Sequence, residues 1–353
     1  MKQLKEQRER INSIDEKIVG LLNQRTKTIL EVGEIKKKHG AEYYSPSREA
    51  EVYKNVLKFN KGPLNKDIIR NIYREIMSSA LALEKGLGIA YLGPEASFTQ
   101  MAAQTKFGSS VRYIPAVSIS EVFALVDKAN ADYGVIPIEN SIEGGVTHTL
   151  DMFIDSELKI CAEVYLEIKH YLIGKTKMKD VKKIYSNPQV FGQCRLWLES
   201  NLPVAEYIPT SSTTSAAIRA SKGKNAAAIA SRLAAAKYGL KVFASSIQDT
   251  AHNITRFLIV GKNYSKRSPK NRTSMLLMVK DKVGALSELL QPLKKAGINL
   301  MKIESRPSKK KVWEYYFFID FEGYIEDEKI KKAVKGLEKH CKLLKVLGSY
   351  PIN

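Results

Sequence analysis

Apolar residues in the first 86 positions recur at helical spacing. Leu4, Ile11 and Ile18 are seven residues apart, and the same broad stripe is filled by Ile14, Leu21, Leu22, Ile29 and Val32. This pattern predicts one helix of about 35 residues, or about 50 Å at 1.5 Å per residue. Two shorter helices are predicted at about residues 48–59 and 66–85. Helices of such unequal length leave apolar surface that one chain cannot cover, which predicts dimerisation by helix exchange.

From Gly88 onward, short β-branched or aromatic runs alternate with helical ones. The predicted strands are GIAYL, VRYI, YGVIPI, VKKIYS, AAAIA, KVFASS and NITRFLIVG. This alternation predicts an α/β domain over residues 87–262, with one or two open sheets. The hydrophilic stretch 262–272 follows it and is predicted to be a linker.

The last segment, residues 272–353, alternates strand and helix in the order βαββαβ. Its predicted strands are SMLLMVK, NLMKIESRP, VWEYYFFIDFE and LLKVLGSY, and its predicted helices are GALSELLQPLKKAG and DEKIKKAVKGLEK. This order, in about 80 residues, is typical of a ferredoxin-like α+β unit. The chain is therefore predicted to be multidomain, with an all-α domain over residues 1–86, an α/β domain and an α+β domain.

Composition narrows the class of protein. No apolar run approaches the roughly 18–20 residues that span a membrane, and the N-terminus is charged throughout. Cys161, Cys194 and Cys341 form neither a metal motif nor a disulfide framework, so a reduced, cytoplasmic protein is expected. The five histidines show no metal-ligand spacing, and neither a Walker motif nor GxGxxG occurs. Neither a metal nor a bound nucleotide is therefore expected.

The formal net charge of +20 is spread evenly along the chain. Residues 1–86 carry 18 basic and 12 acidic side chains, residues 87–271 carry 22 and 15, and residues 272–353 carry 17 and 10. Nucleic-acid binders usually concentrate their positive charge on one element, so nucleic-acid binding is not expected. A Lys-rich solvated surface is the simplest interpretation, and a field that attracts small dianionic substrates is compatible with it.

Four charged residues of the helical domain fall on its predicted apolar stripes. Arg8, Arg25 and Lys36 follow the stripe of the long helix, and Glu84 continues that of the third helix. A cation on a buried stripe must be paired or must bind an anion. Each one alone is also explained by a long side chain that reaches past the edge of the face. All four together favour an anion-binding site.

The run RERINSIDEKIVGLLNQR…EVGEIKKK…SPSREAEV resembles the all-helical class of chorismate mutases over residues 1–86. The resemblance implies that Arg8 from the partner chain, Arg25 and Lys36 hold the two carboxylates and the ether oxygen of chorismate. It also implies that Arg48 and Glu49 complete the pocket, with Glu49 on the substrate hydroxyl. Glu84 stands where the family places a Gln or Glu against the ether oxygen. Ser45 and Ala80 depart from members that have a carboxylate and a hydroxyl there, which affects those contacts and not the activity.

Six polar strings at predicted strand ends carry the candidate chemistry of the α/β domain. They are YLGPEASFTQMAA, SISEV, IPIENSIEGGV, SNPQVFGQC, SSTTSAA and NITRF. Open α/β sheets bind ligands at such ends, although any one string alone is typical of a plain turn. Together they resemble prephenate dehydratase over residues 88–262.

The dehydratase resemblance implies two lobes with the site in a cleft between them, and a reaction that needs no cofactor. Thr255 would be the key catalytic group, Arg256 would hold a substrate carboxylate, and Phe257 would form a wall of the ring site. The residues implied to line the cleft are Asn140 (with Glu139), Ser186, Gln189 and Thr213. Asn187 stands where many members have His, which is a departure at the rim.

Two short segments of the last domain resemble an ACT regulatory domain of the phenylalanine-sensing type, over residues 273–353. They are Gly284–Ala285–Leu286 and Glu304–Ser305–Arg306–Pro307. Gly284 permits close backbone approach at a helix N-terminus, which suits an amino-acid carboxylate. The resemblance implies L-phenylalanine as an effector, bound where the two segments meet across a dimer interface.

In this order the three domains are similar to the bifunctional chorismate mutase–prephenate dehydratase family, with chorismate and prephenate as substrates. A homodimer is expected, and pairing of dimers into tetramers stays open. Two alternatives remain: a non-catalytic amino-acid sensor, and a nucleic-acid-binding regulator that carries an ACT sensor. Thr255 and the cations at Arg8, Arg25 and Lys36 argue against the first, and the even charge argues against the second.

Overall fold

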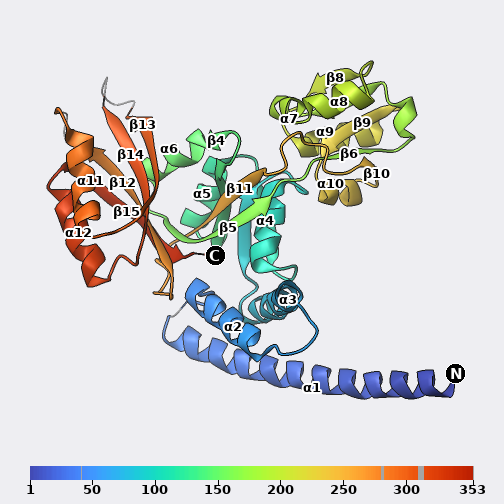
Figure 1. Ribbon diagram of the computed structural model, residues 1–353. Helices are drawn as coiled ribbons and strands as arrows, with labels where there is room; N and C mark the ends of the chain where they lie inside the picture. Colours follow the sequence, from blue (N-terminus) through green and yellow to red (C-terminus); the bar gives the residue numbers. More distant parts are fainter. Residues whose placement is uncertain (41, 280–281, 309–313, 353) are drawn as a thin grey trace. The chain divides into compact units, whose positions relative to one another are not determined.

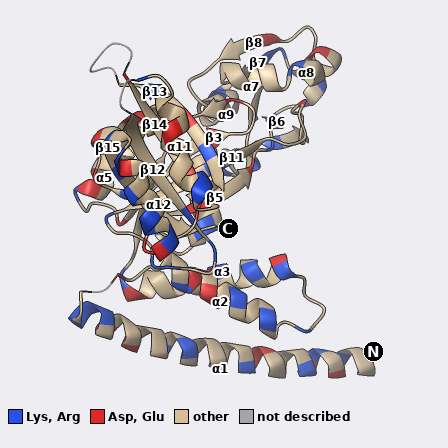
Figure 2. Cartoon of the chain, turned by 60° about the vertical axis from the view of Figure 1, so that its left-hand side comes forward, with Lys and Arg blue, Asp and Glu red and all other residues tan. Residues whose placement is uncertain are grey.

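The computed structural model describes residues 1–40, 42–279, 282–308 and 314–352. The chain forms two compact units: residues 1–87 with 107–112, and residues 88–106 with 113–353. No helix among the described residues is long and apolar enough to cross a membrane. Lys and Arg residues are distributed over many helices and strands rather than gathered on one element (Figure 2).

The first unit consists of three helices: α1 (Lys2–Lys38), α2 (Pro46–Phe59) and α3 (Lys66–Glu84) (Figure 1). The prediction of one very long helix followed by two shorter ones is confirmed, and α1 has 37 residues. The side chain of Ser45 accepts a hydrogen bond from the Arg48 amide (3.4 Å) and so caps α2. Asn65 caps α3 in the same way through the Ile68 amide (2.9 Å).

Most of α1 is exposed in the single chain. Leu4, Ile11 and Ile18 of the predicted stripe are exposed, and Gly33 is the buried residue of the helix. Gly33 allows α1 to approach α3 closely, because a Cβ at this position would lie 2.8 Å from Cγ of Glu84. Among the described residues of the single chain, none buries the apolar stripe toward the N-terminus of α1.

The second unit begins with an α/β lobe built on a mixed sheet of order β2-β1-β3-β11-β5. Its strands are β1 (Gly88–Leu92), β2 (Arg112–Ala116), β3 (Tyr133–Asn140), β5 (Lys159–Glu167) and β11 (Ile254–Gly261), with the short β4 (Gly144–Gly145) beside β3. Its helices are α4 (Phe98–Phe107), α5 (Ile119–Asp127) and α6 (Thr147–Asp155). The strand β11 is antiparallel to both β3 and β5 and lies between them.

A second lobe is built on a sheet of order β10-β6-β9-β7-β8. Its strands are β6 (Tyr171–Gly174), β7 (Lys183–Ser186), β8 (Glu206–Pro209), β9 (Ala226–Ala230) and β10 (Lys241–Ala244). Its helices are η1 (Met178–Asp180), α7 (Pro188–Gln193), α8 (Arg195–Asn201), α9 (Thr213–Lys222) and α10 (Arg232–Lys237). The chain passes between the lobes twice, at residues 168–170 and 245–253. The expected two-lobed α/β architecture is confirmed, although β5, β6 and β8 are absent from the predicted strands.

The C-terminal part has the predicted βαββαβ order. Its elements are β12 (Asn271–Val279), α11 (Ala285–Lys295), β13 (Leu300–Pro307), β14 (Tyr315–Glu322), α12 (Glu328–Glu338) and β15 (Cys341–Pro351). The sheet order is β13-β14-β12-β15, and the two helices cover one face of it through Leu289, Leu293, Val334 and Leu337. Val312 and Trp313, which were included in a predicted strand, lie outside the described residues.

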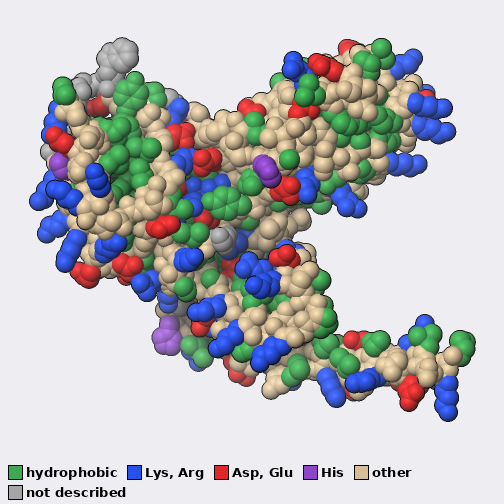
Figure 3. Space-filling model, in the orientation of Figure 1, with side chains coloured by type: hydrophobic (Ala, Val, Ile, Leu, Met, Phe, Trp, Pro, Cys, Tyr) green, Lys and Arg blue, Asp and Glu red, His purple; other side chains and the backbone are tan. Residues whose placement is uncertain are grey.

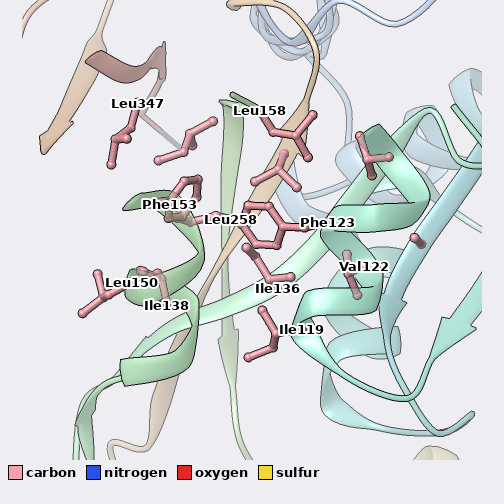
Figure 4. Packing of buried hydrophobic residues seen from close by; sticks show 14 of the residues in the cluster. Ile119, Val122, Phe123, Ile136, Ile138, Leu150, Phe153, Leu158, Leu258 and Leu347 are labelled. Atoms are coloured by element: carbon pink, nitrogen blue, oxygen red, sulfur yellow. The ribbon is translucent and has the colours of Figure 1, made fainter. Parts of the chain in front are cut away.

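The other face of this sheet shares one hydrophobic core with the first lobe. Leu258 and Ile160 of that lobe belong to the same cluster as Leu276, Leu347 and Tyr350. Figure 4 shows Leu347, Phe153 and Leu158 among the side chains of this core. The lobe and the sheet therefore bury apolar surface against each other.

The predicted linker at residues 262–272 is packed rather than free. Ser265, Ser268 and Asn271 are buried, and the Tyr324 hydroxyl donates to the carbonyl of Ser265 (3.2 Å). The prediction took the polar side chains of this stretch as a sign of an exposed linker. They instead form hydrogen bonds within the protein, as where Asn271 Oδ1 accepts from the Ser268 hydroxyl (2.8 Å).

Candidate functional site

The helical unit contains a pocket of about 660 Å³ between the C-terminal part of α1 and the end of α3. It is lined by Leu30, Glu31, Gly33, Glu34, Lys37, Tyr43, Leu83, Glu84 and Lys85. Of the predicted site residues, Glu84 lines this pocket directly. The side chain of Glu84 is only 4% exposed, so its charge must be balanced by a close partner.

Lys36 provides that balance. Its Nζ lies 3.0 Å from Oε1 of Glu84 and donates to the carbonyl of Tyr43 (2.8 Å). Two of the four charged residues on the predicted apolar stripes, Lys36 of α1 and Glu84 of α3, therefore form an ion pair. An ammonium held in this way beside Glu84, which lines the pocket, can also bind an anionic ligand.

The other predicted residues of the helical unit have partners of their own or are partly or fully exposed. Glu49 accepts a hydrogen bond from the Tyr44 hydroxyl (2.7 Å), and Arg48 is exposed and pairs with Glu51 on its own helix (2.7 Å). Arg25 is half-buried on α1, and Arg8 is exposed near its start. Arg8 lies 28 residues before Lys36 on one continuous helix, or about 42 Å at 1.5 Å per residue. One chain cannot bring these two cations to one small molecule.

In the first lobe of the second unit, Thr255 and Asn140 form a close pair. They are directly opposite each other in the β11–β3 register, and Nδ2 of Asn140 donates to Oγ1 of Thr255 (2.8 Å). Thr255 is 9% exposed. Oδ1 of Asn140 accepts from the amides of Ile142 (2.9 Å) and Glu143 (3.1 Å), which fixes the orientation of the side-chain amide. The hydroxyl of Thr255 is thus an acceptor toward Asn140, which leaves its proton for another partner.

A chain of amides extends from this pair toward the second lobe. Nδ2 of Asn140 also donates to Oδ1 of Asn253 (2.7 Å), and Nδ2 of Asn253 donates to Oε1 of Gln193 (3.1 Å). Nε2 of Gln193 donates to Glu143 (2.9 Å). Asn140 belongs to β3, Gln193 to α7 and Asn253 to the second crossing between the lobes, so the hydrogen-bonded chain joins the lobes at the point where Thr255 lies.

His170 completes this network. Its Nε2 lies 3.0 Å from Oε1 of Gln193, and Phe98 packs edge-on against its ring at a centroid distance of 5.6 Å. Burial lowers the pKa of the His170 imidazole, although the hydrogen bond to Gln193 opposes this shift. The ring is therefore neutral near pH 7 and donates from Nε2.

Sequence reasoning missed Gln193, Asn253 and His170. Gln189 was selected from the same string, and it is exposed, whereas Gln193 lies one helical turn later and faces Asn253. The available signal was that spacing of four residues, which places both glutamines on one side of a helix. The partners that select Gln193 are distant in sequence, so no local pattern identifies them.

The remaining predicted residues of this site are placed as follows. Ser186 is fully buried, and its hydroxyl donates to the carbonyl of Ile229 (3.0 Å), so it supports the second sheet. Thr213 is half-buried at the first position of α9. Phe257 is 2% exposed within the lobe. Asn187 caps α7 by accepting from the Gln189 amide (3.1 Å), which is a local role for the residue that departs from the family.

Arg256 differs most from its predicted role. It is 5% exposed, and its guanidinium donates to Glu163 (2.8 Å), Asp320 (2.6 Å) and the hydroxyl of Tyr350 (2.8 Å). Burial would lower the pKa of Arg256, but Tyr350, Asp320 and Glu163 raise it above its ordinary value. All three nitrogens of Arg256 donate to protein oxygens in this structure, and its contact with a substrate carboxylate stays a prediction.

The two predicted effector segments lie on different elements of the C-terminal sheet. Gly284, at φ +78°, precedes α11, with Ala285 buried and Leu286 exposed. Among residues 1–40, 42–279, 282–308 and 314–352, no hydrogen bond or ion pair joins this segment to Glu304–Pro307 within the chain. The spatial meeting implied by the resemblance would therefore require a second chain.

The strand β13 presents its predicted effector residues to opposite faces. Glu304 and Arg306 face the first lobe, where Arg306 pairs with Asp151 (3.2 Å) and a Cβ at Gly145 would collide with the Glu304 carboxylate. Ser305 and Pro307 point the other way and are exposed. Figure 3 shows hydrophobic side chains gathered over β13 and β14, where Met301, Ile303 and Tyr315 are exposed.

Three family models match the chain in order. "Chorismate mutase type II" matches residues 7–85, "Prephenate dehydratase" matches 89–265, and "ACT domain" matches 273–339. The "Bifunctional chorismate mutase/prephenate dehydratase" of Aquifex aeolicus (strain VF5) is 46% identical over 356 residues, which cover 99% of this chain and 98% of that protein.

Two solved structures resemble the second unit. A prephenate dehydratase from Arthrobacter aurescens in complex with L-Phe is 34% identical, with a TM-score of 0.70, covering 75% of this chain and 90% of that one. A protein described as a novel type of quorum quenching acylase is 25% identical, with a TM-score of 0.69, covering 75% of this chain and 98% of that one. Two proteins described with different activities therefore share the structure of the second unit. The Aquifex protein, by contrast, matches this chain in sequence over nearly its full length.

Proposed function

This chain belongs to the bifunctional chorismate mutase/prephenate dehydratase family, and from its two activities we propose a sequential conversion of chorismate to prephenate and then to phenylpyruvate, under feedback control by L-phenylalanine. The observation that carries the proposal is the Thr255–Asn140 pair, held where the two lobes of the dehydratase join. A sensor that binds its ligand without a reaction does not need a threonine hydroxyl that is oriented by a hydrogen bond from an asparagine side chain.

The mutase step is a pericyclic rearrangement, which needs no nucleophile and no obligatory proton transfer. Catalysis therefore rests on holding the reactive conformer and on stabilising charge that develops as the C–O bond breaks. Lys36 and Glu84, with Arg25, are the groups that would face the substrate from one chain. Arg48 and Glu49 would complete the pocket when α2 encloses the substrate.

Arg8 would come from a second copy of the chain. The separation of about 42 Å between Arg8 and Lys36 along α1 excludes a joint contact from one chain. The exposed stripe of Leu4, Ile11 and Ile18 needs cover. A dimer in which each α1 crosses the other chain satisfies both requirements, because it covers the stripe and supplies Arg8 in trans.

In the dehydratase step, prephenate loses CO₂ and its ring hydroxyl together. The electron pair of the breaking bond to the carboxylate enters the ring, the ring C–O bond breaks, and the hydroxide leaves as water once it receives a proton. Because Oγ1 of Thr255 accepts from Asn140, its hydrogen can point at the leaving hydroxyl. Free Thr is a poor acid, so Thr255 would donate a hydrogen bond or relay a proton. Prephenate would bind between the lobes, next to Asn140.

The catalytic part of the proposal is tested by following one solution of the protein supplied with chorismate alone. We expect prephenate to rise and then fall as phenylpyruvate accumulates, with no metal or nucleotide added. Acid quenching at intervals converts the prephenate present to phenylpyruvate, so paired quenched and unquenched samples measure the intermediate. Accumulation of prephenate without enzymatic phenylpyruvate would show that the dehydratase is inactive.

For feedback, L-phenylalanine would bind at the face formed by Gly284–Leu286 of one chain and Glu304–Pro307 of another. The exposed apolar side chains on β13 and Leu286 support this, because they offer a surface that a second chain and an aromatic ligand could cover. The α11 N-terminus at Gly284 would hold the ligand carboxylate.

Replacing Gly284 with Ala is expected to weaken feedback, because the new Cβ would occupy space that is open at Gly284. The phenylalanine concentration that halves prephenate turnover should rise at least about tenfold, the equivalent of about 1.4 kcal/mol. Each rate is expressed relative to the uninhibited rate of the same variant.

Gly297→Ala is the matched control for this change. Gly297 also has a positive φ, of +57°, and lies in the turn that follows the same helix. Both variants pay a similar backbone strain, so only a ligand contact separates them. Equal inhibition curves for the two variants would remove Gly284 from the effector site.

A further inference from the structure

A buried ion cluster joins the catalytic sheet of the dehydratase to the C-terminal sheet. On the dehydratase side are Arg256 of β11 and Glu163 of β5, and on the other side are Asp320 of β14 and Tyr350 of β15. The Glu163 side chain is fully buried, and those of Arg256 and Asp320 are nearly so. The cluster thus spans the junction between two sheets that are far apart in sequence.

The partners of Arg256 are themselves fixed by the C-terminal sheet. The hydroxyl of Ser274 donates to Asp320 (2.5 Å) and lies 2.7 Å from the Tyr350 hydroxyl. Arg272 donates to the same Glu163 oxygen that Arg256 contacts (2.8 Å). Two arginines and two carboxylates balance each other, so no member can be removed without leaving a buried charge unbalanced.

Arg256 immediately follows Thr255 on β11. Neighbouring residues of a strand point to opposite faces of the sheet, so Arg256 is anchored on one face while Thr255 meets Asn140 on the other. The β11–β3 register shifts between Arg256 and Phe257, at the same place. Such irregularities turn the side chains next to them, and the direction of Thr255 therefore depends on how the strand is held here.

We propose that Arg256 is a positioning residue, through which Asp320 and Tyr350 of the C-terminal sheet hold β11 so that the Thr255 hydroxyl stays aligned with Asn140. This inference rests on the proposed role of Thr255. It gives the C-terminal sheet a part in basal dehydratase turnover, separate from any binding of phenylalanine. Arg256 takes no substrate carboxylate in this arrangement.

The test is Asp320→Asn in the full-length protein, assayed with added prephenate. Misalignment of a reacting group can cost about 10²-fold in rate, so we expect kcat to fall by roughly 10- to 100-fold while KM changes little. Asp327→Asn is the control, because Asp327 also pairs with an arginine of the same part of the chain, Arg267 (2.7 Å), but at the surface. Its kcat should match the wild type. Thermal unfolding of each variant, followed by circular dichroism, reports whether the second unit is folded, because the mutase residues lie in the other packed unit.

Tyr350→Phe is a second variant that tests the same proposal if Asp320→Asn does not fold. It removes one hydroxyl and keeps the ring, and its kcat should fall about tenfold, the equivalent of one charge-assisted hydrogen bond. Arg256→Lys combined with Asp320→Asn should lose no more than the worse single variant, since both act through one contact.

Two results would overturn the positioning role. One is a raised KM in Arg256→Lys with unchanged kcat in Asp320→Asn and Tyr350→Phe, which is the pattern of a substrate ligand. The other is unchanged kcat in all three. The role of Thr255 is judged separately, by Thr255→Val: if that variant alone loses turnover, the proposed function stands and the positioning role of Arg256 is wrong.

Discussion

Replacing Thr255 with Val is expected to lower dehydratase turnover by about 10²–10⁴-fold, the range for a positioned proton donor. Val keeps the branched shape that a strand favours and removes only the hydroxyl. Asn140 loses one acceptor but keeps its bond to Asn253 (2.7 Å), so the fold should survive. The measurement is phenylpyruvate formation from added prephenate, with mutase activity of the same sample as the reference.

Two further variants separate chemistry from packing at this position. Thr255→Ser restores a hydroxyl and should recover most of the turnover. Thr149→Val removes a buried hydroxyl from the same lobe, one that donates to the carbonyl of Pro137 (2.6 Å). It should cost about 1 kcal/mol of stability with little change in kcat. If Thr255→Val turned over at nearly the wild-type rate, Thr255 would be a strand residue and nothing more.

Replacing Arg25 or Arg8 with Ala is expected to lower the mutase rate by about 10²–10³-fold, the loss found when one preorganised electrostatic contact is removed. Dehydratase turnover on added prephenate should continue in both variants. The two sites occupy separately packed units of the chain, so loss at one need not reach the other. Arg10→Ala, an exposed change on the same helix, controls for general effects on α1.

Mixing the two inactive variants tests whether Arg8 acts in trans. In a dimer that combines one Arg8→Ala chain with one Arg25→Ala chain, one pocket lacks both arginines and the other lacks neither. After unfolding and refolding together, half the dimers are mixed and half of their pockets are intact. About a quarter of the wild-type mutase rate should then return, as the symmetry of a dimer requires. Recovery of no activity would place both arginines in the pocket of a single chain.

The elements that the sequence predicted well are those with a clear local period. The stripe of α1 and the βαββαβ order of the last domain are both visible in short windows, and both are confirmed. The strand β5 was missed, because its segment KICAEVYLE carries the charged Glu163 within an apolar run. That charge is compatible with a buried strand only because Arg256 and Arg272 neutralise it, and both lie about 100 residues away.

The same limit applies to the site. The charges on the apolar stripes of α1 and α3 predicted an anion-binding site, which stays a prediction; that Lys36 and Glu84 pair with each other was not predicted. The residue types at Thr255 and Arg256 indicated a functional site. The alternation of a strand does not show, however, which residues will pack against each of its two faces. The partners of Arg256 are contributed by β5, β14 and β15, so its surroundings could be known only from the tertiary structure.

The core shared by Leu258, Leu276 and Leu347 also bears on how such proteins can recombine. A gene exchange that replaced residues 273–353 with the corresponding part of a distant relative would have to match this apolar surface. It would also have to supply a counter-charge for Arg256 where Asp320 now stands. A crossover before β1 would leave this apolar surface and this counter-charge within one parent's sequence, whereas a crossover at the hydrophilic stretch before β12 would separate them. For inheritance, the dehydratase lobes and the C-terminal sheet form a single block.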